Sequence, residues 1–351
     1  MRLSLSQMTN AIQTNLDRLM KHRPPVLSTL MTSIPLYSQA ATQGTFSGAR
    51  ALELNYHSRY PAANITENAV TDNAAVNANQ SSAPSVSGVL VIVHGIGEHS
   101  GRYGAVVKGL TAAGYAVFGF DNQGHGKSEG QRGHIDSWQD YRSNVQAFLQ
   151  LVREKAPTAP LFLGHSLGGL IVLDYVLRNA QTPEFEALNI QGLIVSAPPI
   201  QPCSGTASSR RIMLARLLSG VFPRFTLKMG IDGSGLSRDP SITENTEQDP
   251  LTHPYVTLRW GSETLTTLEW VKAHIDRLAL PILLTHGEAD SVVSPLGSQQ
   301  IFKQIKNSDN TLTVYPGSYH EPHNDLDAEQ VVSDLVSWVD RRNLAQACNA
   351  A

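Results

Sequence analysis

From residue 88 onward, short apolar runs alternate with longer segments of helical spacing. The runs contain almost no polar residues, as expected of strands that are buried on both faces. The predicted strands are residues 89–93, 116–120, 160–163, 192–196, 281–285 and 311–315. The predicted helices are residues 102–113, 138–152, 170–177 and 327–342. This order predicts an α/β fold, in which helices cover both faces of a mostly parallel sheet.

Three stretches depart from this rhythm. Residues 1–45 form an N-terminal extension, and residues 62–87, which are rich in Asn, Ala, Ser and Thr, predict a mobile loop. Between them, residues 51–57 alternate apolar and polar positions, as a half-exposed strand does. Residues 199–275 interrupt the strand–helix order and contain a predicted amphipathic helix. The apolar positions of this helix and its continuation are Leu214, Leu217, Leu218, Val221 and Phe225.

These departures divide the chain. We expect a core in two parts, residues 46–198 and 276–351, with residues 199–275 inserted as a helical cap or lid. An insertion after a strand lies at the carboxyl ends of the sheet, where reactive groups of parallel sheets gather. The alternative is a peripheral packing helix whose arginines are only solvated.

The motif Gly164-His165-Ser166-Leu167-Gly168 carries the first candidate for chemistry. An apolar run precedes it and a helical pattern follows it, so Ser166 is expected on a sharp turn between a strand and a helix. Such a turn lifts the hydroxyl clear of the sheet, and the flanking glycines allow the chain to pack closely around it. The motif predicts that Ser166 is a nucleophile.

A serine nucleophile needs a base to take its proton and an acid to orient that base. Asp290 follows the predicted strand 281–285, and His320 follows the strand 311–315. Both therefore emerge at the same sheet edge as Ser166, in the order expected after a Gly-x-Ser-x-Gly turn. Three nearby residues compete for these roles: Glu288 as the acid, and His286 and His323 as the base.

Ester or amide hydrolysis also requires donors for the negative oxygen of the tetrahedral intermediate. The backbone amide of Leu167, directly after the nucleophile, is one candidate. The second is the amide of Ile96, in the glycine-containing loop that follows the strand 89–93. We predict that these two amides form an oxyanion hole.

Composition and charge narrow the possible functions. The chain has 351 residues, 41% of them hydrophobic, and a net charge of −3. This balance does not suggest nucleic-acid binding, which requires clustered positive charge. No apolar run is long enough to span a bilayer, so the expectation is a cytoplasmic protein. The histidines lack the spacing of metal ligands, so neither a metal nor a cofactor is expected.

With these residues in view, the chain resembles the monoacylglycerol lipase and lysophospholipase group of the α/β-hydrolase superfamily. The resemblance rests on residues 94–103, 121–133 and 164–169 and on the loops of Asp290 and His320; the inserted stretches 236–240 and 249–251 are also similar. It implies an α/β-hydrolase fold, with the same nucleophile, triad partners and oxyanion donors that the motifs indicate. Two charged residues in the matched loops, Glu98 and Arg102, are expected to brace these loops or to bind substrate.

The expected activity is hydrolysis of a single-chain lipid ester, most readily monoacylglycerol, through an acyl-enzyme on Ser166. The insertion would then also allow transient contact with a membrane surface. Three alternatives stay open: a lysophospholipase, an esterase or prolyl aminopeptidase on the same triad, and a non-catalytic binding protein. The sequence does not indicate an oligomeric state.

Overall fold

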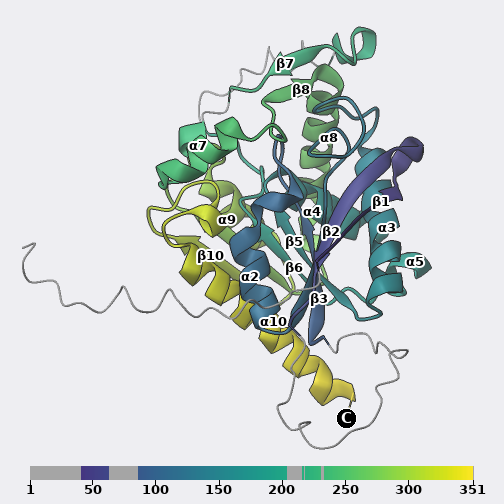
Figure 1. Ribbon diagram of the computed structural model, residues 1–351, viewed down its shortest axis with the longest axis vertical. Coiled ribbons are helices and arrows are strands. Elements are labelled where there is room, and N and C mark those ends of the chain that lie inside the picture. The colour runs from purple at the N-terminus through teal and green to yellow at the C-terminus, as the bar shows by residue number, and fades with distance from the viewer. Residues whose placement is uncertain (1–40, 63–85, 204–215, 217, 231–232, 351) are drawn as a thin grey trace, which may run out of the picture. The chain divides into compact units, whose positions relative to one another are not determined.

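A computed structural model of the protein describes residues 41–62, 86–203, 216, 218–230 and 233–350 (Figure 1). Most of the predicted N-terminal extension and nearly all of the predicted loop 62–87 therefore lie outside the described residues. Side chains beyond residue 343 are also outside the description.

The centre of the fold is an eight-stranded sheet with the strand order β1-β2-β4-β3-β5-β6-β9-β10. The six strands from β4 to β10 in this order pair in parallel. At the other end of the order, β2 pairs antiparallel with both of its neighbours, β1 and β4. This arrangement confirms the predicted mostly parallel sheet. The strands are β1 (Ala41–Ser47), β2 (Glu53–Arg59), β3 (Gly88–Val93), β4 (Tyr115–Phe120), β5 (Pro160–His165), β6 (Gly192–Ser196), β9 (Ile282–Gly287) and β10 (Asn310–Tyr315).

Helices cover both faces of the sheet because the central strands are apolar on both sides (Figure 1). In β3, Val91 packs in one apolar cluster with residues of α3, α4, α8 and α9, while Ile92 packs in another with residues of α2 and α10. These helices are α2 (Gly104–Ala112), α3 (Trp138–Lys155), α4 (Leu167–Asn179), α8 (Leu258–His274), α9 (Pro295–Gln304) and α10 (Ala328–Ala350); the short α5 (Pro183–Glu186) follows α4.

The segment between β6 and β9, which we call the insertion, carries its own elements. Its strands β7 (Thr226–Lys228) and β8 (Tyr255–Thr257) pair antiparallel as a separate two-stranded sheet. Between them lie the 3-10 helix η3 (Gly233–Gly235) and helix α7 (Pro240–Gln248), and α8 follows β8. Helix α8 packs on α3 and α4 and so anchors the insertion to the core.

The predicted amphipathic helix is described only in part. Residues 216 and 218–221 are helical, whereas Leu214 and Leu217 lie outside the described residues. Phe225 lies beyond this helix, in the segment that continues it to β7. Among the described residues, none of the helices combines the length and the apolar character needed to traverse a bilayer.

The start of α4 presses directly against the end of β3. A Cβ added to Gly168 would lie 1.9 Å from the carbonyl oxygen of Val93, a distance that no side chain can tolerate. By contrast, a Cβ at Gly261, inside α8, would meet no heavy atom within 4 Å.

We therefore predict opposite effects for the same substitution at these two glycines. Gly168→Ala should lower the free energy of unfolding by about 2 kcal/mol or more, because backbone must move. Gly261→Ala should raise it by up to about 1 kcal/mol, since alanine favours the helix and restricts the unfolded chain. Urea denaturation of both variants measures this, and equal effects at the two sites would contradict the packing.

Candidate active site

Ser166 lies on the predicted turn between β5 and α4. Its backbone has φ 50° and ψ −117°, a conformation that is strained for any residue except glycine. The turn is tight because Gly164 and Gly168 approach each other: a Cβ on Gly164 would lie 2.6 Å from the Gly168 carbonyl oxygen. The glycines on either side of the serine are thus required by the packing of the turn.

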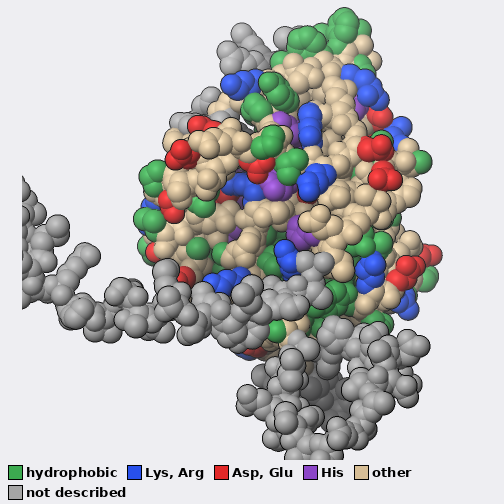
Figure 2. Space-filling view, in the orientation of Figure 1, with side chains coloured by type: hydrophobic (Ala, Val, Ile, Leu, Met, Phe, Trp, Pro, Cys, Tyr) green, Lys and Arg blue, Asp and Glu red, His purple; other side chains and the backbone are tan. Residues whose placement is uncertain are grey.

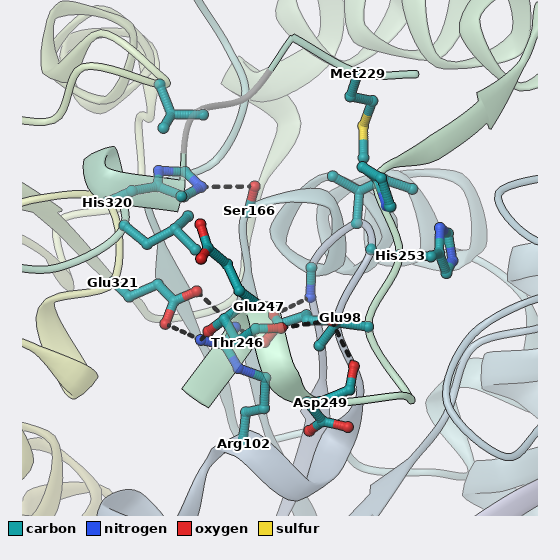
Figure 3. Close-up of a pocket in the computed structure, with 18 of the residues that line it drawn as sticks. Glu98, Arg102, Ser166, Met229, Thr246, Glu247, Asp249, His253, His320 and Glu321 are labelled. Carbon is teal, nitrogen blue, oxygen red and sulfur yellow. Dashed lines mark hydrogen bonds and ion pairs between the residues drawn. The ribbon is translucent and has the colours of Figure 1, made fainter. Parts of the chain in front are cut away.

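The structure brings the three predicted triad residues together. The Nε2 atom of His320 lies 3.1 Å from Ser166 Oγ (Figure 3). The Nδ1 atom of His320 lies 2.7 Å from Asp290 Oδ2. The turn of Ser166 follows β5, and the loops of Asp290 and His320 follow β9 and β10. All three therefore lie at the carboxyl ends of the parallel strands. All three residues are buried.

Asp290 is held as a carboxylate by four hydrogen-bond donors. Its Oδ1 accepts from the amides of Val292 and Val293 at 2.8 and 2.9 Å, and its Oδ2 accepts from His286 and His320. Burial alone would raise the pKa of Asp290, but the hydrogen bonds from His286 and His320 outweigh it and hold the pKa well below its usual range. The group therefore stays ionised at neutral pH.

The ionised carboxylate sets the protonation of His320. A carboxylate can only accept, so Nδ1 of His320 carries the proton. In the neutral ring, Nε2 is then free to accept the hydroxyl proton of Ser166. Burial lowers the pKa of His320, but the hydrogen bond to Asp290 and its negative charge outweigh burial and raise the pKa above 6.5.

The competing candidates occupy other positions. Glu288 is exposed and accepts a hydrogen bond from the amide of Gly317, so it supports the loop before His320. His286 is buried behind Asp290, with its Nε2 atom 3.0 Å from Asp290 Oδ2 and 3.1 Å from the Val293 carbonyl oxygen. His323 is stacked on Tyr103, with ring centroids 4.8 Å apart.

The loop that follows β3 lies against the serine. A Cβ on Gly95 would be 3.3 Å from the Cβ of Ser166, so this backbone passes close to the hydroxyl. Ile96, the next residue, lines the pocket in front of Ser166. Leu167 is the first residue of α4, where a backbone amide has no partner within the helix. Ile96 thus lies at the pocket into which Ser166 opens, and Leu167 directly follows Ser166 at the start of α4.

Glu98 holds this loop in place. Its Oε1 accepts hydrogen bonds from the Gly95 amide at 2.6 Å and from the Tyr103 hydroxyl at 2.8 Å. Burial raises the pKa of Glu98, but the charges of Arg102 and His94 and the hydrogen bond from the Gly95 amide together outweigh it and leave the pKa below its ordinary value. Glu98 is therefore a carboxylate that fixes the backbone beside Ser166.

Arg102 connects this loop to two other parts of the site (Figure 3). Its Nη1 donates to Glu98 Oε2 at 3.1 Å and to Glu321 Oε1 at 2.7 Å, and its Nη2 donates to Glu321 Oε2 at 2.9 Å. Nη2 also donates to Thr246 of α7 at 2.7 Å. One guanidinium thus joins the Ile96 loop, the His320 loop and the insertion.

A pocket of about 490 Å³ opens in front of the Ser166 hydroxyl, between the core and the insertion. Its walls carry apolar side chains from both parts, together with the charged groups described above. The apolar lining residues are Ile96, Met229, Leu236, Pro254 and Val292. Among the described residues, no group of three or more His, Cys, Asp or Glu side chains could hold a metal ion.

Some residues of this site were missed from the sequence. Glu321 directly follows His320 and could have been suspected from that position, whereas Thr246 carries no signal of its own. Asp325 was also missed: its Oδ2 accepts from the Tyr319 amide at 2.7 Å, and both of its oxygens bind Arg238 of the insertion. It therefore fixes the loop of His320.

Comparison with known proteins identifies the family of this chain. A family model described as "Serine aminopeptidase, S33" matches residues 84–327. Monoglyceride lipase of Rattus norvegicus is 33% identical over 258 residues, which cover 72% of this chain and 82% of that enzyme. An uncharacterized abhydrolase domain-containing protein of Dictyostelium discoideum is 32% identical over 72% of this chain, which spans 26% of that longer protein.

Among solved structures, monoacylglycerol lipase of Paleococcus ferrophilus is similar with a TM-score of 0.65 and 33% identity, over 73% of this chain and 95% of that one. The predicted resemblance is therefore confirmed. The chain belongs to the serine aminopeptidase S33 family of the α/β-hydrolase superfamily, in the group that contains the monoacylglycerol lipases.

Proposed function

We propose that this protein hydrolyses monoacylglycerol to glycerol and a free fatty acid through an acyl-enzyme on Ser166. The observation that carries the proposal is the 3.1 Å contact between Ser166 Oγ and His320 Nε2 at the wall of an open pocket. Relatives named monoglyceride lipases support the substrate, and the mixed apolar and polar lining suits an ester with one acyl chain.

Acylation begins when His320 Nε2 accepts the proton of the Ser166 hydroxyl and the oxygen attacks the ester carbonyl carbon. The imidazolium that forms is stabilised by the negative charge of Asp290, 2.7 Å from Nδ1. When the tetrahedral intermediate collapses, the C–O bond to glycerol breaks. His320 then returns its proton to the departing glycerol oxygen.

Deacylation repeats these steps with water. His320 removes a proton from a water molecule, whose oxygen attacks the acyl carbonyl, and the bond to Ser166 breaks as the proton returns to Oγ. In both halves the negative oxygen would bind the amides of Ile96 and Leu167. Each such donor contributes roughly 3 kcal/mol in comparable sites.

Glu98 and Arg102 act in this proposal by bracing the site. Glu98 accepts from the amide of Gly95, next to the proposed donor Ile96. The hydrogen bonds of Arg102 run to Glu98, Glu321 and Thr246, so its guanidinium is already occupied by protein groups. The pair therefore fixes the distance between the oxyanion loop and the loop of His320.

The insertion supplies a surface for contact with lipid aggregates. Apolar side chains that are 43–70% exposed gather around β7 and the helix before it, at one end of the molecule in Figure 2. These are Val221, Phe222, Phe225, Leu227 and Tyr255. Because Lys228 and Met229, next along the chain, line the pocket, a lipid held at this surface would be close to the pocket mouth.

The first test is hydrolysis of 1-monoacylglycerols of varied chain length, followed by glycerol release. The wild type should cleave them and should be labelled by a fluorophosphonate probe. Ser166→Ala should lose labelling and at least about a thousandfold in kcat/KM, because no other hydroxyl replaces the nucleophile.

Two results would contradict the assignment. A higher kcat/KM for proline amides than for any ester would favour the aminopeptidase alternative. Equal labelling of the wild type and Ser166→Ala would remove Ser166 from the mechanism and favour a binding protein.

The second test concerns the lipid surface. The double variant Phe222→Ser/Phe225→Ser should bind phosphatidylcholine vesicles roughly tenfold more weakly, because two exposed aromatic rings no longer enter the interface. Vesicle flotation measures this. The matched control is Leu296→Ser/Leu326→Ser, which removes two exposed apolar side chains elsewhere, 57% and 65% exposed. Equal binding by both double variants would contradict the proposed surface.

A further inference from the structure

The pocket in front of Ser166 carries an excess of negative charge. Four carboxylates line it, together with one arginine, one lysine and three histidines. The carboxylates belong to Glu98, Glu247, Asp249 and Glu321, and the basic groups to Arg102 and Lys228.

Three of these carboxylates have close partners in the structure. Glu98 and Glu321 share Arg102, as described above. Asp249 lies 2.9 Å from His99 Nε2 and also accepts from the amide of Leu251. An arginine is the side chain best suited to bind a phosphate. In this pocket, however, both terminal nitrogens of Arg102 already donate hydrogen bonds to protein groups.

Glu247 is different. It lies in α7, in the turn of helix that carries Thr246, and its side chain is directed into the pocket (Figure 3). Its Oε1 lies beside Gly233 of η3, where an added Cβ would be 3.6 Å away. Within the part of the chain that the structure describes, no hydrogen bond or ion pair to its carboxylate is found, and the residue is exposed to solvent.

We propose that Glu247 is a specificity-determining residue that disfavours esters whose alcohol portion carries a phosphate. Its carboxylate, which has no ion-pair partner among the described residues, faces the space that a bound ester shares with Ser166. A neutral glycerol meets no electrostatic penalty there, whereas a phosphate-bearing glycerol meets the like charge of Glu247. This inference rests on the proposed function and separates monoacylglycerol from anionic lysophospholipids.

The experiment compares two substrates that differ only in the phosphate: a 1-monoacylglycerol and the 1-acylglycerol 3-phosphate with the same acyl chain. For each protein, the ratio of kcat/KM for the anionic over the neutral ester is measured. Glu247→Gln should raise this ratio roughly three- to tenfold at low ionic strength, the size expected for one charge removed from a partly solvated cleft. The increase should shrink at about 0.5 M salt, where the Debye length is roughly 4 Å.

Helix α7 provides a matched control. Glu244 lies one turn earlier on the same helix, does not line the pocket and is a partner of Gln248 at 3.1 Å. Glu244→Gln removes the same charge from the protein and should leave the ratio unchanged. An equal ratio in the Glu244→Gln and Glu247→Gln variants would overturn the inference.

A second readout separates this inference from the proposed function. Non-hydrolysable ether analogues of the two lipids compete with a soluble p-nitrophenyl ester, and the ratio of their inhibition constants reports the same charge effect. If the wild type did not cleave monoacylglycerol, the proposed function would fail. If Glu247→Gln left the ratio of inhibition constants unchanged, the role of Glu247 would fail on its own.

Discussion

The hydrogen bond between the Asp290 carboxylate and Nδ1 of His320 is the interaction on which the chemistry of this site depends. It determines which nitrogen of His320 carries the proton, and therefore which nitrogen can accept the proton of Ser166. The carboxylate can serve in this way because His286 and two backbone amides keep it ionised in a buried position. Three loops after three parallel strands meet at this point, so the register of the sheet fixes the geometry.

A second network keeps the surrounding loops at the required distances. Arg102 ties the loop of Ile96 to Glu321, which follows His320, and reaches Thr246 of the insertion. On the other side, Arg238 of the insertion binds Asp325, which in turn holds the amide before His320. The insertion is therefore connected to both sides of the triad. A movement of the insertion would therefore displace the loop of Ile96 and the loop of His320.

Much of this arrangement could be predicted from the sequence, because the order of strands and helices fixes where loops emerge. Ser166, Asp290 and His320 each follow an apolar strand, and that was sufficient to bring them together. Strand β1 was missed because its sequence lacks an apolar run, and it is ordered by pairing with β2. Thr246 and Glu247 could not be found, since their place in the pocket depends on the path of the insertion, which no periodicity encodes.

The most direct test of the central interaction is the titration of the His320 ring by ¹⁵N NMR, with its signals assigned by comparison with His320→Gln. Because Asp290 stabilises the imidazolium, the pKa of His320 should lie above 6.5, so the ring is charged and inactive as a base below that pKa and neutral above it. Above it, Nδ1 should carry the proton and Nε2 none. In Asp290→Asn, the pKa should fall. A His320 pKa at or below 6.5 in the wild type, unchanged in Asp290→Asn, would contradict the account.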